Sequence, residues 1–494
     1  MADFKDYENF DALGLAELVR RREVTPDALL DAAIEKVEAV NPSINAVVQH
    51  FYDAAREAID RGLPQGPFTG VPFLVKDLFT FCAGQPCGNG SRLYQGFVPG
   101  HDHELVARYR RAGLVIFGRT ATSEFGLSVS TETAACGPTR NPWNLGHSSG
   151  GSSGGAASAV AAGILPAAHG SDGGGSIRIP AATCGLFGLK PTRARNPSGP
   201  DVGEGWAGLA TGHVITRSVR DSAAFLDATH GPAAGDPYAA PAIARPFLDE
   251  VGAEPGRLRI AFSYDGNGQQ AAHPDCRAAV DHAVGLLTEL GHDLVPGDPP
   301  INEQDLRGHM LAIVTAQTRE ALDLGHPLTG AAVKEKEVEP ITWAIAEAGR
   351  KVTAGRYIAA VNGIHRFGRQ MAGFLTDQDL YLSPTLARPP LPLVVLDTQS
   401  DDLEGFITKL TDYMPHTQIA NMTGQPAANL PLSWNAEGLP IGVQLIAPFG
   451  EEARLLRVAA QLEEAAPWRD RRPKKYPPGL SGGSSFRGKS GVTQ

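Results

Sequence analysis

Cysteine is scarce in this sequence, and no cluster of cysteines is present. Five cysteines are scattered over 494 residues, and no second pair faces Cys82 and Cys87 at the spacing of a zinc site. An odd and dispersed set of thiols is typical of a reducing compartment and not of a disulfide framework. We therefore expect free thiols and a cytoplasmic protein.

Long hydrophobic runs are missing as well. The N-terminus, MADFKDYENF (1–10), is acidic and polar and has no apolar core of a signal peptide. The longest nearly apolar stretch, 156–168, contains Gly163 and Pro166. It is shorter than the roughly 20 residues that a transmembrane helix needs. The sequence predicts neither a secretory signal nor a membrane span.

An excess of positive charge is also absent. The formal net charge is −10, so no basic surface is expected to bind nucleic acid or an anionic membrane. The 14 histidines are scattered, without an HExxH motif or a pattern of paired carboxylates. We therefore expect no metal and no other cofactor.

Glycine and proline, in contrast, are abundant, with 57 and 38 residues, which favours many tight turns over a long helical bundle. Short apolar runs at 71–75 and 114–118 alternate with a helix-like stretch at 103–113. This alternation predicts an α/β fold in which helices cover a sheet.

Three segments contain residue types suited to nucleophilic catalysis. GVPFLVKDLF (70–79) places Lys76 within an apolar run, and GGSSGG (150–155) sets two serines between glycines. GSDGGGSIRIPA (170–181) places Ser176 after three glycines. A buried lysine is costly as a cation, so burial lowers its pKa and makes the amine available as a base.

Each segment also has a simpler interpretation. A lone lysine beside apolar residues usually extends its ammonium group to solvent, and a Gly/Ser cluster is usually a flexible linker. The structured run IRIPAATCGLFGLKP (177–191) argues against a linker. Glycines before a serine leave backbone N–H groups open to the oxygen of a tetrahedral intermediate. The serine needs a neighbouring base, and the candidate is the lysine, directly or through the second serine.

Together these segments resemble the amidase signature family. The resemblance continues through 137–146, 185–193 and 421–431, and it covers most of residues 10–235 and 378–470. It implies an α/β amidase-signature fold, with a large mixed β-sheet core covered by helices on both faces, and the activity of a serine amidase.

The resemblance also implies roles for individual residues. Ser176 matches the nucleophile, Ser152 the serine preceded by a cis peptide bond, and Lys76 the lysine of a Ser-cisSer-Lys triad. The residues implied for the oxyanion hole are Gly173, Gly174 and Gly175. The residues implied to support the site are Ser153, Asp172 and Arg178.

The sequence shows no internal repeat and no obvious linker, so we expect one interleaved domain made of five segments. These are an N-terminal helical segment (1–65), the amidase signature core (66–235), a variable substrate-shaping region (236–377) that is mostly helical over 303–375, the C-terminal part of the core (378–467) and a flexible tail (468–494).

The predicted reaction is hydrolysis of a carboxamide, through an acyl-enzyme, to a carboxylate and an amine or ammonia. Small neutral, aryl, and cyclic or oligomeric amides are candidate substrates, because 143–146 and 458–473 are similar to family members that act on cyclic amide dimers. Alternatives are the glutaminase subunit of a tRNA-dependent amidotransferase and a carbamate or ester hydrolase. Retention of the lysine and both serines disfavours an inactive scaffold. The expected partner is a small-molecule amide, and a homodimer is left open.

Overall fold

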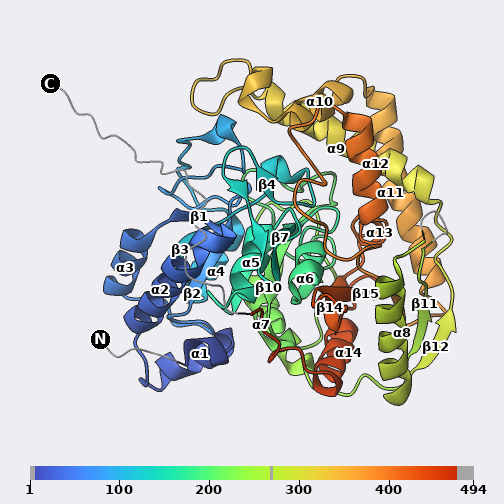
Figure 1. Ribbon diagram of the computed structural model, residues 1–494, viewed down its shortest axis with the longest axis horizontal. Coiled ribbons are helices and arrows are strands. Elements are labelled where there is room, and N and C mark those ends of the chain that lie inside the picture. The colour runs from blue at the N-terminus through green and yellow to red at the C-terminus, as the bar shows by residue number, and fades with distance from the viewer. Residues whose placement is uncertain (1–5, 267–270, 475–494) are drawn as a thin grey trace.

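The computed structural model describes residues 6–266 and 271–474. Its centre is an eight-stranded sheet in the order β12-β11-β13-β15-β14-β9-β10-β8 (Figure 1). The strands are β8 (Ala167–Asp172), β9 (Phe187–Lys190), β10 (Thr211–Thr216), β11 (Arg259–Phe262), β12 (Asp293–Pro296), β13 (Leu380–Pro384), β14 (Ala427–Trp434) and β15 (Pro440–Ile446). Strand β11 runs parallel to both β12 and β13, and the other neighbours pair antiparallel, so the sheet is mixed.

A smaller sheet lies beside the large one and has the order β1-β3-β2. It consists of β1 (Val47–His50), β2 (Pro72–Lys76) and β3 (Val115–Thr120). Two short hairpins follow along the chain. They pair β4 (Glu132–Thr133) with β5 (Gly137–Pro138), and β6 (Arg140–Asn141) with β7 (Asn144–Ser148). Strand β2 is buried along its whole length, which fits the continuous apolar run of its sequence.

Helices cover both faces of the large sheet, as the alternation of its strand residues shows. Ile260 and Leu382 pack in one apolar cluster with α7 (Val219–Thr229), α8 (Pro274–Glu289) and α14 (Glu452–Ala465). The neighbouring residues Ala261 and Tyr381 pack in another cluster with α9 (Glu303–Asp323), α11 (Ala354–Phe374) and α13 (Gln418–Thr423). Successive side chains of a strand point to opposite faces, so the two clusters lie on the two sides of the sheet. The predicted architecture is confirmed.

Helices are interspersed with strands along the chain (Figure 1). Their bounds are α1 (Ala12–Arg20), α2 (Pro26–Ile44), α3 (Tyr52–Asp60), α4 (Glu104–Arg111), α5 (Gly154–Ala161), α6 (Arg178–Cys184), α7 (Val219–Thr229), α8 (Pro274–Glu289), α9 (Glu303–Asp323), α10 (Pro340–Gly349), α11 (Ala354–Phe374), α12 (Leu403–Tyr413), α13 (Gln418–Thr423) and α14 (Glu452–Ala465). Over residues 6–266 and 271–474, no helix is both long and apolar enough to cross a bilayer.

Helix α5 joins the two sheets, and its small residues are what allow this. All eight of its residues are buried, and the helix contacts β2 and β3 of the small sheet and β8 and β10 of the large one. A Cβ at Gly155 would lie 2.3 Å from Ala121 N and 2.6 Å from Ala46 O. Only glycine allows so close an approach of helix to strand. Through this helix the lysine on one sheet and the serines near the other come together.

The C-terminal segment remains packed beyond α14. Trp468, the first residue of the tail expected from the sequence, is 2 % exposed, and its indole N–H donates to Arg217 O at 2.9 Å. Residues 475–494 of that tail lie outside the described residues. All five cysteines are free thiols, and all but Cys136 are buried.

Candidate active site

The three predicted catalytic residues lie on different parts of the chain, and the structure joins two of them, Lys76 and Ser152, by a direct hydrogen bond. Lys76 is the last residue of β2, Ser152 lies just before α5, and Ser176 lies between β8 and α6. The Lys76 Nζ donates to Ser152 Oγ at 2.7 Å and to Ser171 Oγ at 2.9 Å. The peptide bond between Gly151 and Ser152 is cis. Lys76 is fully buried, whereas Ser176 retains 8 % exposure.

Burial sets the protonation of the lysine. Removal from water lowers the pKa of Lys76 to about 7, and the negative charge of Asp172 opposes that change. The next residue, Asp77, points away from the lysine, as strand alternation predicts. It accepts from Gly88 N at 2.8 Å and lies 3.7 Å from Arg119. A substantial fraction of the Lys76 amine is therefore neutral near pH 7.

The serine after Ser152 ties two segments of the site together. Ser153 Oγ donates to Ser171 O at 3.2 Å and accepts from Ser171 N at 3.3 Å. These two hydrogen bonds join the start of α5 to the end of β8. Ser171 also accepts from Lys76 Nζ. The contact between Ser153 and Ser171 therefore holds the segments 150–155 and 170–181 in a fixed position relative to the lysine.

The glycine loop before Ser176 is folded around a carboxylate. The Gly175 N–H donates to Asp172 Oδ1 at 2.7 Å, and Ile177 N–H donates to Asp172 Oδ2 at 3.2 Å. Gly175 has φ +135°, and a Cβ there would lie 2.5 Å from Thr417 Oγ1, so the position requires glycine. The Gly175 amide therefore already has an acceptor within the loop, and the oxyanion role expected of Gly173, Gly174 and Gly175 stays a prediction.

Apolar side chains close against the other two glycines. A Cβ at Gly173 would lie 2.9 Å from Trp206 Cε3. A Cβ at Gly174 would lie 2.8 Å from Met310 Cε and 3.6 Å from Met414 Cε. Met310 belongs to α9, so the region expected to shape the substrate site does reach the loop.

A buried network holds the loop in place. Asp172 and Arg178 are both fully buried and form an ion pair at 2.9 Å. Arg178 also donates to Thr417 O at 2.8 Å, Gln444 Oε1 at 2.5 Å and Asn421 Oδ1 at 2.6 Å. Asn421 Nδ2 donates to Asp172 Oδ1 at 2.8 Å. Burial would raise the pKa of Asp172, but the charge of Arg178 and the bonds from Arg178 and Asn421 hold it well below its usual range.

We expect Arg178→Met to lower the free energy of unfolding by about 3–5 kcal/mol, because it leaves the Asp172 carboxylate buried without its partner. Urea unfolding followed by circular dichroism measures the change. The matched control is Arg257→Met, which breaks the exposed pair between Arg257 and Asp293 and should leave the midpoint almost unchanged. Equal shifts in both variants would contradict a bracing role for the buried pair.

Sequence reasoning did not identify four residues of this site. They are Ser171, Thr417, Asn421 and Gln444. Ser171 is adjacent to Asp172 in the Gly/Ser-rich segment, so this position in the sequence could have identified it as a residue of the site. The other three come from the C-terminal third of the chain. Asn421 opens the stretch 421–431 that resembles the family, but the sequence assigns no role to it, to Thr417 or to Gln444.

His169 is buried and accepts from Lys76 N at 3.3 Å, so it packs beside the strand that carries the lysine.

No group of three or more His, Cys, Asp or Glu side chains suited to a metal ion occurs within residues 6–266 and 271–474. The candidate site instead offers a neutral amine, hydroxyl groups and backbone amides. These groups are sufficient for nucleophilic attack on a carbonyl and for stabilisation of the resulting oxyanion.

Comparison with known proteins defines the class. A family model described as Amidase matches residues 28–456, and the chain belongs to this family, the amidase signature family. The protein is an amide hydrolase, like the relatives it resembles over nearly their whole length.

Two named relatives show how similar the chain is to other members of this family. The chain is 40 % identical over 482 residues to the 6-aminohexanoate-cyclic-dimer hydrolase of Paenarthrobacter ureafaciens, covering 95 % of this chain and 97 % of that protein. It is 35 % identical over 475 residues to the putative amidase AmiC of Mycobacterium tuberculosis, covering 93 % and 95 %.

Solved structures agree with the fold. A 6-aminohexanoate cyclic dimer hydrolase complexed with substrate matches with a TM-score of 0.88 and 38 % identity, covering 95 % of this chain and 99 % of that one. A bacterial aryl acylamidase of the same family matches with a TM-score of 0.83 and 27 % identity, covering 93 % and 98 %. The amidase-signature fold predicted from the sequence is therefore confirmed.

Proposed function

We propose that this enzyme cleaves the C–N bond of a carboxamide with Ser176 as nucleophile, Lys76 as base and Ser152 as the proton relay. The observation that carries the proposal is the contact of 2.7 Å between Lys76 Nζ and Ser152 Oγ, made by a lysine whose pKa is lowered to about 7. A neutral amine can accept a proton, whereas an ammonium group cannot. Ser176 is the proposed nucleophile because it follows the glycine loop and retains 8 % exposure, and the Lys76 amine is its proposed base.

The acylation step follows from this arrangement. The Ser176 hydroxyl gives its proton through Ser152 to Lys76, and its oxygen bonds to the carbonyl carbon of the amide. The negative oxygen of the tetrahedral intermediate is stabilised by backbone amides of Gly173 and Gly174. The C–N bond then breaks, and the leaving nitrogen takes the proton back from Lys76 through Ser152. The product is an acyl-enzyme and a free amine or ammonia.

Deacylation reverses these roles. A water molecule gives a proton through Ser152 to Lys76, and its oxygen bonds to the acyl carbon. The bond between this carbon and Ser176 Oγ then breaks, and the serine oxygen recovers the proton. The carboxylic acid leaves and ionises at neutral pH. Each step uses a side chain as acid or base in the state left by the preceding step.

For the substrate, we infer a neutral amide of the cyclic, oligomeric or aryl type. The walls against the glycine loop are Trp206, Met310 and Met414, which suit an apolar acyl or amine group and not a charged amino-acid head group. The likeness to cyclic-dimer hydrolases supports the same class. A match of 24 % identity to one subunit of the glutamyl-tRNA(Gln) amidotransferase of Thermotoga maritima supports the fold alone. Carbamates and esters remain open to the same chemistry.

A substrate panel tests this proposal. The purified chain is assayed with the cyclic dimer of 6-aminohexanoate, an acyl anilide, a short aliphatic amide, glutamine, an aryl carbamate and an ester, with Ser176→Ala as the background. We expect the cyclic dimer or the anilide to be hydrolysed with a kcat/KM at least about a hundredfold above that of glutamine. Glutamine as the best substrate would contradict the assignment in favour of an ammonia-releasing subunit.

We also propose that the sequence-derived division of the chain describes its working parts, with 236–377 as the substrate-shaping region. The approach of Met310 to the glycine loop supports this division. The free thiols support a reducing, cytoplasmic setting for the enzyme.

A further inference from the structure

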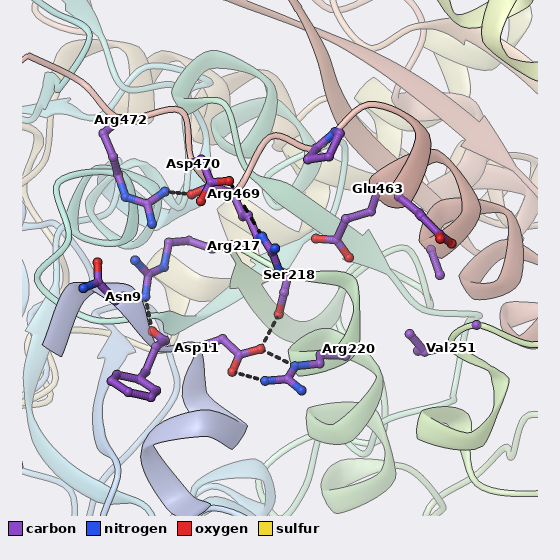
Figure 2. A pocket seen from close by; sticks show the side chains of 15 residues that line it. Asn9, Asp11, Arg217, Ser218, Arg220, Val251, Glu463, Arg469, Asp470 and Arg472 are labelled. Atoms are coloured by element: carbon purple, nitrogen blue, oxygen red, sulfur yellow. Dashed lines mark hydrogen bonds and ion pairs between the residues drawn. The ribbon is translucent and has the colours of Figure 1, made fainter. Parts of the chain in front are cut away.

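A cavity lies apart from the predicted catalytic residues, where distant parts of the chain meet. It has a volume of about 880 Å³ and is formed by the residues before α1, the start of α7 and the end of α14 with the segment after it (Figure 2). None of its lining residues belongs to the glycine loop or to the Lys76, Ser152 and Ser176 group. The volume lies in the range of small-molecule sites.

One side of this cavity carries two guanidinium groups, those of Arg217 and Arg472, with the Asp470 carboxylate in the same lining. Arg217 is 6 % exposed, and it donates to Glu8 O at 2.7 Å and to Phe10 O. These bonds to backbone fix its orientation but do not neutralise its charge. Within the described residues, neither Arg217 nor Arg472 forms an ion pair with a carboxylate. Burial, and next the positive charge of Arg472, lower the pKa of Arg217 to about 10, against the charges of Asp221 and Asp11, so Arg217 stays charged near neutral pH. Burial also lowers the pKa of Arg472, and the charge of Asp470 opposes this.

The opposite side carries an acid with a free acceptor. Figure 2 shows Glu463 across Ser218 and Arg469 from Arg217 and Arg472. Glu463 Oε2 accepts from Val219 N at 3.2 Å at the start of α7. Its Oε1 is buried and has no hydrogen-bond partner among the described residues. Burial raises the pKa of Glu463 to about 7, and a cation beside it would favour the ionised form.

Two further ion pairs line the cavity, one between Asp11 and Arg220 and one between Arg469 and Asp470, the latter at 3.9 Å. Asp11 accepts from Arg220 Nε at 2.5 Å and Nη2 at 2.6 Å, and from Ser218 Oγ at 3.1 Å. The lining also includes the apolar residues Val251, Ala460 and Pro467. The cavity therefore offers cations at one side, an acceptor at the other and some apolar surface in its lining.

We propose that this cavity binds an ω-amino carboxylate, with the carboxylate on Arg217 and Arg472 and the ammonium group on Glu463. A carboxylate between two guanidinium groups replaces like-charge repulsion by charge-assisted hydrogen bonds. An ammonium group gives Glu463 Oε1 the donor it lacks. The choice of ligand rests on the proposed function in one respect, because hydrolysis of a cyclic or oligomeric amide leaves a chain with a carboxylate at one end and an amine at the other.

Binding is measured by isothermal titration of 6-aminohexanoate into the full chain carrying Ser176→Ala, which removes turnover from the measurement. Hexanoate and hexylamine serve as ligands that lack one of the two charges. We expect saturable binding of 6-aminohexanoate, and binding at least about tenfold weaker for each single-charge ligand, since each loses a charge-assisted contact. Hexanoate or hexylamine binding as tightly as 6-aminohexanoate would overturn the proposal.

Variants locate the bound ligand. In the same background, Arg472→Gln and Glu463→Gln should each weaken binding at least about tenfold. The matched control is Arg471→Gln, because Arg471 is the neighbouring residue but stacks over the Trp434 ring at 4.2 Å and does not line this cavity. It should bind as the parent does. Equal affinity in all three variants would place the ligand elsewhere, for example at the catalytic serine, and would overturn the proposal.

The titration tests the cavity site, and the amide panel tests the proposed reaction independently of it. The titration does not depend on turnover, so a chain that hydrolyses none of the amide panel can still bind 6-aminohexanoate in this cavity. Conversely, loss of binding with an active panel would reject the cavity site and leave the proposed reaction standing.

Discussion

Ser176→Ala is expected to lower kcat by about 10⁴-fold or more, because no other group can form the acyl-enzyme. The fold should persist, since the change removes one hydroxyl from a residue that retains 8 % exposure. Steady-state hydrolysis of the best amide of the panel measures the loss. A fluorophosphonate probe gives a second readout, since it should label the parent at Ser176 and leave the variant unlabelled.

The matched control for this substitution is Ser158→Ala. Ser158 is also buried and lies on α5, but its hydroxyl donates to Arg140 O at 2.8 Å and touches no proposed catalytic group. It should keep probe labelling and most of the activity. Full labelling of Ser176→Ala, with the adduct on another serine, would show that the nucleophile has been misassigned.

Lys76→Ala is expected to remove most of the activity, by about 10²–10⁴-fold, and with it the pH dependence that a lysine base creates. In the parent, kcat/KM should fall about tenfold per pH unit below pH 7, because protonation converts the neutral amine to an ammonium that cannot accept a proton. Above pH 7 the amine is mostly neutral, so the profile should level off. Initial rates from pH 5 to pH 9 give this profile.

Two further variants sharpen the test of the base. Lys76→Arg should not restore activity, because a guanidinium group stays charged throughout this pH range. Lys190 is a second buried lysine whose pKa burial lowers to about 7, but its Nζ donates to Pro191 O at 2.6 Å. Lys190→Ala should therefore keep the acidic limb of the profile. An unchanged profile in Lys76→Ala, or loss of the limb only in Lys190→Ala, would refute the lysine mechanism.

Much of the candidate site could be predicted because its chemistry is concentrated in short segments. Lys76 stood out as a charge within an apolar run, and Ser152 and Ser176 stood out as serines among glycines. The close packing of Gly155 and Gly175 against neighbouring atoms explains why these segments are so rich in glycine. Local sequence is informative here because only glycine tolerates such crowding, even by atoms from distant segments, so the crowded positions are marked by residue type.

The residues that hold the site in place through hydrogen bonds could not be predicted in the same way. Asn421 and Gln444 lie in ordinary helix and strand sequence, and only folding brings them to Arg178. The use of the Gly175 amide by Asp172 likewise depends on how the loop turns, and residue type does not reveal it. Side chains separated by some 240–270 residues carry no mutual signal in a single sequence.

The sequence by itself predicted the α/β architecture from the alternation of short strands and helices, and the resemblance of three short motifs indicated the family and implied the three residues of the proposed catalysis, because such patterns are local properties. Only the tertiary structure decided that Lys76 is fully buried with its amine 2.7 Å from Ser152 Oγ. Only it placed the guanidinium groups of Arg217 and Arg472 opposite Glu463 in one cavity. Burial and charge pairing arise from the packing of distant segments, and they set the pKa of the proposed base and the charges around the cavity.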